Sequence, residues 1–254
     1  MISLLSPAKK LNYKPMIRTC DISEPKFATE AVNLVKTVSK LDVAQLSKLM
    51  SISQSLSELN KTRFLKFSAS PGLDDVKQAA FTFAGDTYVG LDAVNLAPDT
   101  DSFFQRSVRI ISGLYGLLRP FDMIQPHRLE MGSKLSNPRG KNLYEFWGTR
   151  LTEELEQLLK EHECKVIVNL ASDEYFRAIN TKTLTAKVIT PKFFENKDGR
   201  KKMISFYAKK ARGSMARFII SNKIDNPEEL KNFDLDGYRL SVEESNGSTL
   251  VFER

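Results

Sequence analysis

The densest group of basic side chains in the sequence lies between residues 197 and 217. This segment holds eight lysines and arginines but a single acidic residue, Asp198. Phe206 and Tyr207 stand beside the charges, and such rings stack on nucleic-acid bases while lysine and arginine neutralise phosphates. We interpret the segment as a nucleic-acid-binding surface, with a solvated hairpin and helix face as the alternative. The basic residues that we assign to this surface are Lys209, Lys210, Arg212 and Arg217, together with Lys9 and Lys10 in an N-terminal loop.

A second group of chemically useful side chains follows the apolar run at residues 165–170. Asn169, Asp173 and Glu174 stand at the end of this run, which has the β-branched composition of a buried strand. The carboxyl end of such a strand is where α/β proteins place ligands, and a carboxylate there can act as a general base or stabilise positive charge on a sugar. The two acids also fall in the first turn of an expected helix that starts at Ser172, where they would stabilise the helix dipole without any chemistry. Both interpretations stay open.

A pair of short helices is predicted over residues 42–67. Asp42 can cap the first helix, Ser51-Ile52-Ser53 forms the connector, and Ser55 with Glu58 has the spacing of a capping box for the second. A tight pair of this kind resembles a helix-hairpin-helix unit, whose connector can lie on a phosphate backbone. The glycines usual in such a hairpin are absent, so an ordinary helical pair is the alternative. The basic residues of the second helix are Lys61, Arg63 and Lys66, of which we assign Lys61 and Arg63 to nucleic-acid binding.

These groups must be positioned by an α/β fold with a mixed sheet and surrounding helices. An apolar strand at residues 2–5, a helix–strand–helix order around residues 165–170 and two later hairpins predict this class. We expect one domain over residues 1–254 that includes the helical pair. The remaining expected elements are helices over 23–40, 143–160 and 208–221, and hairpins formed by 187–195 with 200–207 and by 238–243 with 249–253.

Glycines and paired charges mark the segment from residue 109 to residue 132. Gly113 and Gly116 would allow close backbone approach. Its charged residues could form an ion-pair network or a polar site, and we favour the structural role for Asp122 and Glu130 because partly buried arginines need carboxylates. The four charged residues concerned are Arg119, Asp122, Arg128 and Glu130.

The overall composition excludes several classes of protein. The net charge of +7 favours polyanionic partners, and 41% hydrophobic residues are enough for a sizeable core. Cys20 and Cys164 form no CxxC pair, which fits a reducing compartment, and we expect no signal peptide and no membrane span. There is no phosphate loop or dinucleotide fingerprint, and His127 and His162 are the only histidines, so we predict no cofactor and no metal site.

The sequence resembles the YaaA family of bacterial peroxide-stress resistance proteins nearly from end to end. Long blocks in the same order carry the resemblance, and together they are highly specific. Lys10 and His127 depart from residues common at their positions in the family, without affecting the assignment. The matching blocks are Ser6–Lys9, Phe83 with Gly85–Asp86, Tyr88 with Gly90–Leu91, Ser112–Gly116, Leu118–Pro120, Arg128–Gly132, Asn169–Phe176 and Ser205–Gly213.

The resemblance implies a cytoplasmic protein that limits damage to DNA and protein during hydrogen peroxide stress and is associated with less unincorporated iron. It also implies a mixed α/β fold with a basic cleft, a helix-hairpin-helix element and binding of DNA. Carried onto this chain, the helix-hairpin-helix corresponds to residues 42–67. The basic cleft would draw on Lys9, Lys209, Lys210, Arg212 and Arg217.

Three classes of function compete at this point. The leading hypothesis is a stress protein that binds double-stranded or distorted DNA without established catalysis, with no membrane attachment and no obligate protein partner. The second is an enzyme acting on a nucleobase or nucleoside, of the lyase or glycosylase type, with Asn169, Asp173 and Glu174 beside a phosphate-holding cleft. The third is an iron-handling protein, which would need clustered carboxylates at a spacing that the sequence does not display.

Overall fold

The structure is a computed structural model that describes residues 1–14, 21–197 and 200–254. Cys20 and the expected turn at Asp198 and Gly199 lie outside these residues. Among the described residues, no helix is both long enough and apolar enough to cross a membrane.

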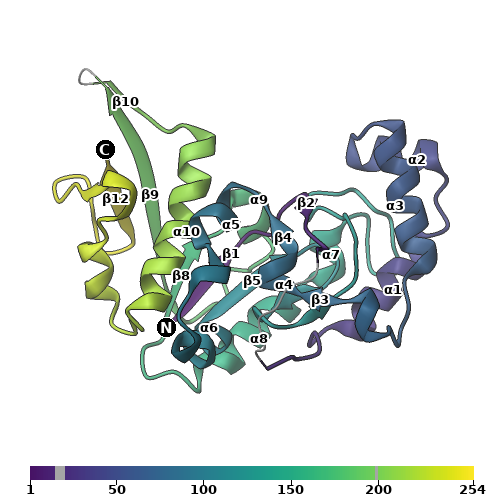
Figure 1. Cartoon of the computed structure of the whole chain (residues 1–254), viewed down its shortest axis with the longest axis horizontal. Helices are drawn as coiled ribbons and strands as arrows, with labels where there is room; N and C mark the ends of the chain where they lie inside the picture. The colour runs from purple at the N-terminus through teal and green to yellow at the C-terminus, as the bar shows by residue number, and fades with distance from the viewer. Residues whose placement is uncertain (15–20, 198–199) are drawn as a thin grey trace.

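An 8-stranded mixed sheet forms the centre of the molecule and confirms the predicted fold class (Figure 1). Its strands follow the order β11-β12-β9-β8-β1-β5-β6, with β10 paired to β9. Neighbours from β12 to β5 run parallel, and the pairs β5–β6, β9–β10 and β11–β12 are antiparallel. Its strands are β1 (Ile2–Leu5), β5 (Val108–Ser112), β6 (Gly116–Leu118), β8 (Val166–Leu170), β9 (Lys187–Lys197), β10 (Arg200–Lys202), β11 (Arg239–Leu240) and β12 (Thr249–Glu253).

The two central strands are apolar because both of their faces are covered. Every residue of β1 and β8 is buried, as expected for strands inside the parallel part of a sheet. Two small sheets lie outside the main one. They pair β2 (Lys10–Leu11) with β4 (Phe83–Ala84), and β3 (Lys77–Gln78) with β7 (Met123–Ile124).

The helices α1 to α3 gather at one end of the long axis, and β9, β10 and β12 lie at the other (Figure 1). The α-helices are α1 (Ala28–Val38), α2 (Val43–Met50), α3 (Gln54–Lys66), α4 (Ala79–Thr82), α5 (Asp86–Leu91), α6 (Asp101–Ser107), α7 (Leu143–Trp147), α8 (Arg150–Leu159), α9 (Asp173–Phe176) and α10 (Ser205–Ser221). Five short 3₁₀ turns complete these residues: η1 (Leu73–Asp75), η2 (Ala93–Asn95), η3 (Pro98–Thr100), η4 (Pro227–Asn232) and η5 (Leu235–Gly237).

The longest helix, α10, packs on β8 and β9 and crosses α5 at very short range. A Cβ atom on Gly213 would lie 1.8 Å from the backbone oxygen of Thr87, and one on Gly90 would lie 2.1 Å from that of Lys210. Only glycine at both positions permits this approach, so the two glycines fix the position of α10 beside α5.

Several predicted boundaries were wrong. The expected helix over 143–160 is two helices, because Gly148 adopts φ +53° and ends α7. The expected strand over 200–207 ends at Lys202, and α10 begins at Ser205 rather than at 208, because the amide of Ala208 donates to the carbonyl of Ile204 and closes a helical turn. The helix expected from residue 23 begins only at Ala28, three residues after Pro25. In the C-terminal hairpin, the first strand covers only residues 239–240.

Candidate functional site

The parallel pairing of β1 with β8 brings the segments that follow them together at the carboxyl edge of the sheet. Leu5 pairs with Leu170, and the next residues meet through side chains. The amide of Ser172 donates to Oγ of Ser6 at 2.8 Å, and that hydroxyl lies 3.3 Å from Oγ of Ser172. Ser172 occupies the predicted N-cap position of α9, but its side chain makes no capping hydrogen bond. Its hydroxyl ties the two loops together.

Glu130 bridges two cations at this edge. One carboxylate oxygen lies 3.0 Å from Nζ of Lys9, and the other accepts from Nη2 of Arg128 at 2.8 Å. The side chains of Glu130 and Arg128 are only 17% and 15% exposed, so this pair is largely shielded from water. This contact agrees with the structural role predicted for Glu130, and it also places a carboxylate within the candidate site.

Two buried phenols complete the edge. The hydroxyl of Tyr88 donates to the backbone oxygen of Ser6 at 3.0 Å. Burial raises the pKa of Tyr88 well above its usual value. The pKa of Tyr175 is raised by burial and, less, by the carboxylates of Glu174 and Glu130. Both hydroxyls are therefore protonated at neutral pH, and that of Tyr88 uses its proton in the bond to Ser6.

The three residues predicted for catalysis have different surroundings. Asn169 is 6% exposed and its Oδ1 accepts from the amide of Ala171 at 3.1 Å, which is a structural contact. Glu174 uses Oε1 to accept from the amide of Gly132 at 2.9 Å and so anchors a loop. Asp173 is exposed at the start of α9.

Asp173 is therefore the predicted carboxylate that is open to a ligand. It lines a shallow pocket of about 490 Å³ with Tyr144 and Arg177. Arg212 on α10 lies near it: burial lowers the pKa of Arg212, and the Asp173 carboxylate acts in the opposite direction. The structure thus brings together one residue from each of the two predicted groups.

The basic residues predicted on α10 do not form one open row. Lys209 is exposed, whereas Nζ of Lys210 lies 2.9 Å from Asp236 and Nη1 of Arg217 lies 3.3 Å from Asp92. Arg212 is partly buried. In the N-terminal loop, Lys9 is exposed although it pairs with Glu130, and Lys10 is exposed in β2.

Lys61 and Arg63 on α3 also have contacts inside the protein. Nζ of Lys61 donates to the backbone oxygens of Ser39 and Leu41, each at 2.7 Å, and so caps the end of α1. Burial lowers the pKa of Arg63, and its guanidinium contacts Asn60 at 3.4 Å. The positions of Lys61 and Arg63 give them structural roles that their charge alone did not reveal.

The hairpin between α2 and α3 has a specific geometry. The predicted cap at Asp42 is present at the start of α2, where Asp42 and Gln45 form a capping box. Ser51 adopts φ 52° in the left-handed region, and Ile52 is buried at 9% exposure. The N-cap of α3 is Ser53, whose Oγ accepts from the amide of Leu56, so the capping box predicted at Ser55 was wrong.

The start of α3 leaves three backbone donors available. Within the described part of the chain, the amides of residues 53–55 have no hydrogen-bond partner. A pocket of about 650 Å³ separates this hairpin from the loop at residues 132–136, and Lys48, Ser51 and Lys134 are among its lining residues. Gly132 also lines this groove and donates to Glu174, which connects the wall of the groove to the start of α9.

Sequence reasoning missed part of this arrangement. Lys48 and Lys134 stand alone in their segments and gave no signal, although each is exposed along the groove. Tyr88 and Tyr175 belong to segments that the resemblance had marked, but a buried tyrosine has the same appearance in a sequence whether it packs or binds. No group of three or more His, Cys, Asp or Glu that could hold a metal ion occurs among the described residues.

Comparison with known proteins places the chain in a family. The family model described as peroxide stress protein YaaA matches residues 1–244. A UPF0246 protein of Aliivibrio fischeri (strain MJ11) is 47% identical over 100% of this chain and 98% of its own length. UPF0246 proteins of Ralstonia pickettii (strain 12J) and Hahella chejuensis (strain KCTC 2396) are 48% and 45% identical over 100% of this chain and 99% of theirs. The chain therefore belongs to the family of peroxide stress protein YaaA, as its sequence blocks had indicated.

Proposed function

We propose that this chain contributes to peroxide resistance by binding double-stranded or distorted DNA through the α2–α3 hairpin and the groove beside it. The observation that carries the proposal is the geometry of the connector: Ser51 in the left-handed region, Ile52 buried, and unbonded amides at residues 53–55. Amides at the start of a helix bind phosphate oxygens, because they are free donors at the positive end of the helix dipole. A phosphate backbone is the ligand that this arrangement fits best.

Exposed lysines extend the electropositive surface away from the hairpin. Lys48 and Lys134 line the groove, and Lys66 is exposed at the end of α3. The α2–α3 hairpin and β10 lie toward the same side of the molecule in Figure 1, with the labels of α9 and β2 between them. Lysines along this side would each contact a phosphate and release counterions, without reading the base sequence.

The proposed role in the cell rests on membership of the peroxide stress protein family. We infer that the protein acts in the cytoplasm, where bound DNA would be protected during peroxide stress. The lower level of unincorporated iron that the resemblance implies is part of the same proposal, as an outcome measured in cells. It assigns no iron ligand to the chain.

The sharpest test of the hairpin removes one backbone donor and preserves the helix. Gln54 is the first residue of α3, a position where proline is favoured because its missing amide is unbonded in any case. Ser53 has a ψ of 161°, an extended conformation that is compatible with proline at the next position. Gln54→Pro should therefore weaken binding of a DNA duplex about three- to tenfold, since one charge-assisted hydrogen bond is lost.

The matched control is Gln54→Ala, which removes the same side chain, including its bond to Glu58, but keeps the amide. It should bind DNA as the unmodified protein does. Fluorescence anisotropy with a labelled duplex measures both affinities, and thermal unfolding checks that both variants fold. Equal affinity of the two variants would remove the Gln54 amide from the interface and contradict the proposed role of the hairpin.

A second candidate function is an enzyme acting on a nucleobase or nucleoside at the carboxyl edge. It is favoured by Asp173, which is exposed, lines its own pocket at this edge and acts electrostatically on Arg212. In this reaction class, the carboxylate would stabilise positive charge on a sugar while a cation holds the phosphate. Asp173→Asn should then fold and bind DNA normally but fail to protect cells from peroxide. Full protection by this variant would exclude catalysis by Asp173.

A further inference from the structure

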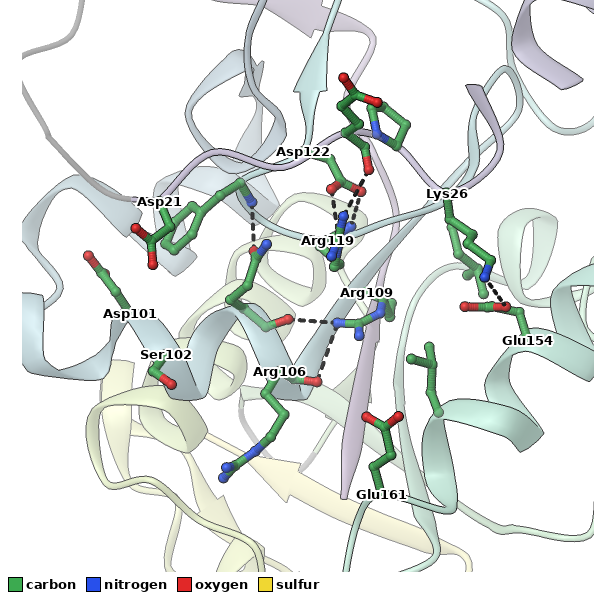
Figure 2. Close-up of a pocket in the computed structure, with 16 residues that line it drawn as sticks. Asp21, Lys26, Asp101, Ser102, Arg106, Arg109, Arg119, Asp122, Glu154 and Glu161 are labelled. Atoms are coloured by element: carbon green, nitrogen blue, oxygen red, sulfur yellow. Dashed lines mark hydrogen bonds and ion pairs between the residues drawn. The ribbon is translucent and has the colours of Figure 1, made fainter. Parts of the chain in front are cut away.

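A polar pocket of about 660 Å³ lies far from the groove, between α6, α8 and the segment at residues 21–26 (Figure 2). Its floor is formed where β5 pairs with β6, near the amino end of β5. The pairing of Ile110 with Leu118 brings Arg119 close to Arg109 there. Because β5 runs parallel to β1, this is the end of the sheet opposite Ser6. The pocket is therefore separate from the candidate functional site.

Arg109 is the central charge of this pocket. Arg109 is only 5% exposed. Its Nη1 donates to the backbone oxygens of Gln105 and Val108 at 2.8 and 2.6 Å. Within the described ranges, Nε and Nη2 have no hydrogen-bond partner and no carboxylate lies within ion-pair distance of the guanidinium. A buried guanidinium without a direct counter-charge is the donor set that a carboxylate recognises.

The other charges in the lining differ in how they are engaged. Arg119 is paired with Asp122 at 3.0 Å, and Lys26 lies 3.8 Å from Glu154. Figure 2 shows Arg109 between these two pairs, with Glu161 on the remaining side. Glu161 is exposed, and in the described part of the chain its carboxylate has no ion pair or hydrogen bond.

This pattern distinguishes between classes of ligand. The lining contains six acidic residues and four basic ones, so a lone anion at Arg109 would be repelled by the surrounding carboxylates. A lone cation could pair with Glu161 but would leave the open edge of the Arg109 guanidinium without a partner. A molecule that carries a carboxylate and an ammonium group can pair with Arg109 and with a lining carboxylate at the same time. Leu117, Phe121 and Leu158 supply an apolar wall for its side chain.

We propose that this pocket binds a free α-amino acid with an apolar side chain. The carboxylate of the amino acid binds the open edge of the Arg109 guanidinium, the ammonium group binds Glu161, and the side chain lies against Leu117 and Leu158. The volume is within the usual range of small-molecule sites, so an amino acid of the size of leucine or phenylalanine fits. The proposal is independent of DNA binding.

Isothermal titration calorimetry on the full chain tests this assignment, with L-leucine and L-phenylalanine as ligands. N-acetyl-L-leucine lacks the ammonium charge and L-leucinamide lacks the carboxylate, so each should bind about tenfold more weakly than L-leucine, the effect of one lost charged hydrogen bond. Failure of both amino acids to bind, or equal binding of L-leucine and its two derivatives, would overturn the proposal.

Two variants at neighbouring surface positions assign the contact. Glu161→Gln should weaken L-leucine binding about tenfold and abolish the preference over N-acetyl-L-leucine. Glu163→Gln removes a carboxylate that is also exposed but does not line the pocket, so the affinity of this variant for L-leucine should be unchanged. Both changes are on the surface, and thermal unfolding confirms that they fold. If the two variants bind L-leucine equally, Glu161 is not the ammonium ligand and the proposed binding mode is wrong.

Discussion

Replacing Lys61 by methionine distinguishes a structural lysine from one that we propose binds DNA. The ammonium of Lys61 reaches from α3 to the carbonyl groups of Ser39 and Leu41, at the end of α1. Methionine keeps most of the apolar stem but has no donor, so the substitution removes both hydrogen bonds and little packing. The matched control is Lys66→Met, because Lys66 is exposed on the same helix and has no such contact within the described chain.

The expected loss of stability follows from the two hydrogen bonds. A hydrogen bond to a charged group contributes about 1.5–3 kcal/mol when it is shielded from water. Lys61 is half-buried, and water can hydrate the two carbonyl groups once the ammonium is gone, so we expect a total of about 1–3 kcal/mol. For a chain of this size, each kcal/mol changes Tm by roughly 2–4 °C. Lys61→Met should therefore lower Tm by about 2–12 °C, and Lys66→Met by about 2 °C or less.

Differential scanning fluorimetry measures these shifts, and anisotropy at several salt concentrations measures DNA affinity. At a temperature where both variants are folded, Lys61→Met should bind DNA as the unmodified protein does. Lys66→Met should bind more weakly and reduce the slope of log affinity against log salt by about one. If Lys61→Met unfolds at the unmodified Tm and shows the lower salt slope, the ammonium of Lys61 contacts phosphate instead of α1, and its structural role is refuted.

Three further predictions concern packing, protonation and the carboxyl edge. Gly213→Ala should destabilise the protein by about 1–3 kcal/mol, because the added Cβ would collide with α5. Gly72→Ala is the control: its Cβ would make only an ordinary contact, so the free energy of unfolding should change by less than about 0.5 kcal/mol. Urea denaturation measures both changes. Burial lowers the pKa of His127 and of His162 to about 4, so NMR should show both rings titrating there. Since unfolded histidines bind protons near pH 6.5, these two groups stabilise the fold fully above that pH and lose this contribution as pH falls from 6.5 through 4. Glu174→Ala should cost about 1 kcal/mol by releasing its loop, while Glu174→Gln, which keeps an acceptor, should cost less than half of that.

The fold class was predictable because its strongest signals are local. The apolar runs of β1 and β8 indicate strands buried on both faces, and the connector at residues 51–53 divides α2 from α3 as expected. The errors arose where a backbone conformation overrides side-chain periodicity. Leu151 and Leu155 continue the apolar spacing that starts in α7, but the positive φ of Gly148 breaks the helix before them.

The candidate site was only partly predictable because its partners come from distant segments. Lys9 and Glu130 are far apart in the sequence, and only the parallel order of the strands brings them to one edge. The same limit applies to Asp173 and Arg212, which were assigned to different chemical groups but lie near each other. Spacing in the sequence identifies a reactive side chain, but its partner depends on topology.

Charge density in the sequence also overstates the surface available to a polyanion. Lys210 and Arg217 neutralise Asp236 and Asp92, and Lys61 caps a helix, so these cations would have to break an internal contact before they met a phosphate. The salt dependence of DNA binding counts only the phosphates that displace counterions. Exposed lysines without such a partner among the described residues should therefore determine that slope, and they lie on several elements instead of in one basic run. Examples are Lys10, Lys48, Lys66, Lys134, Lys202 and Lys209.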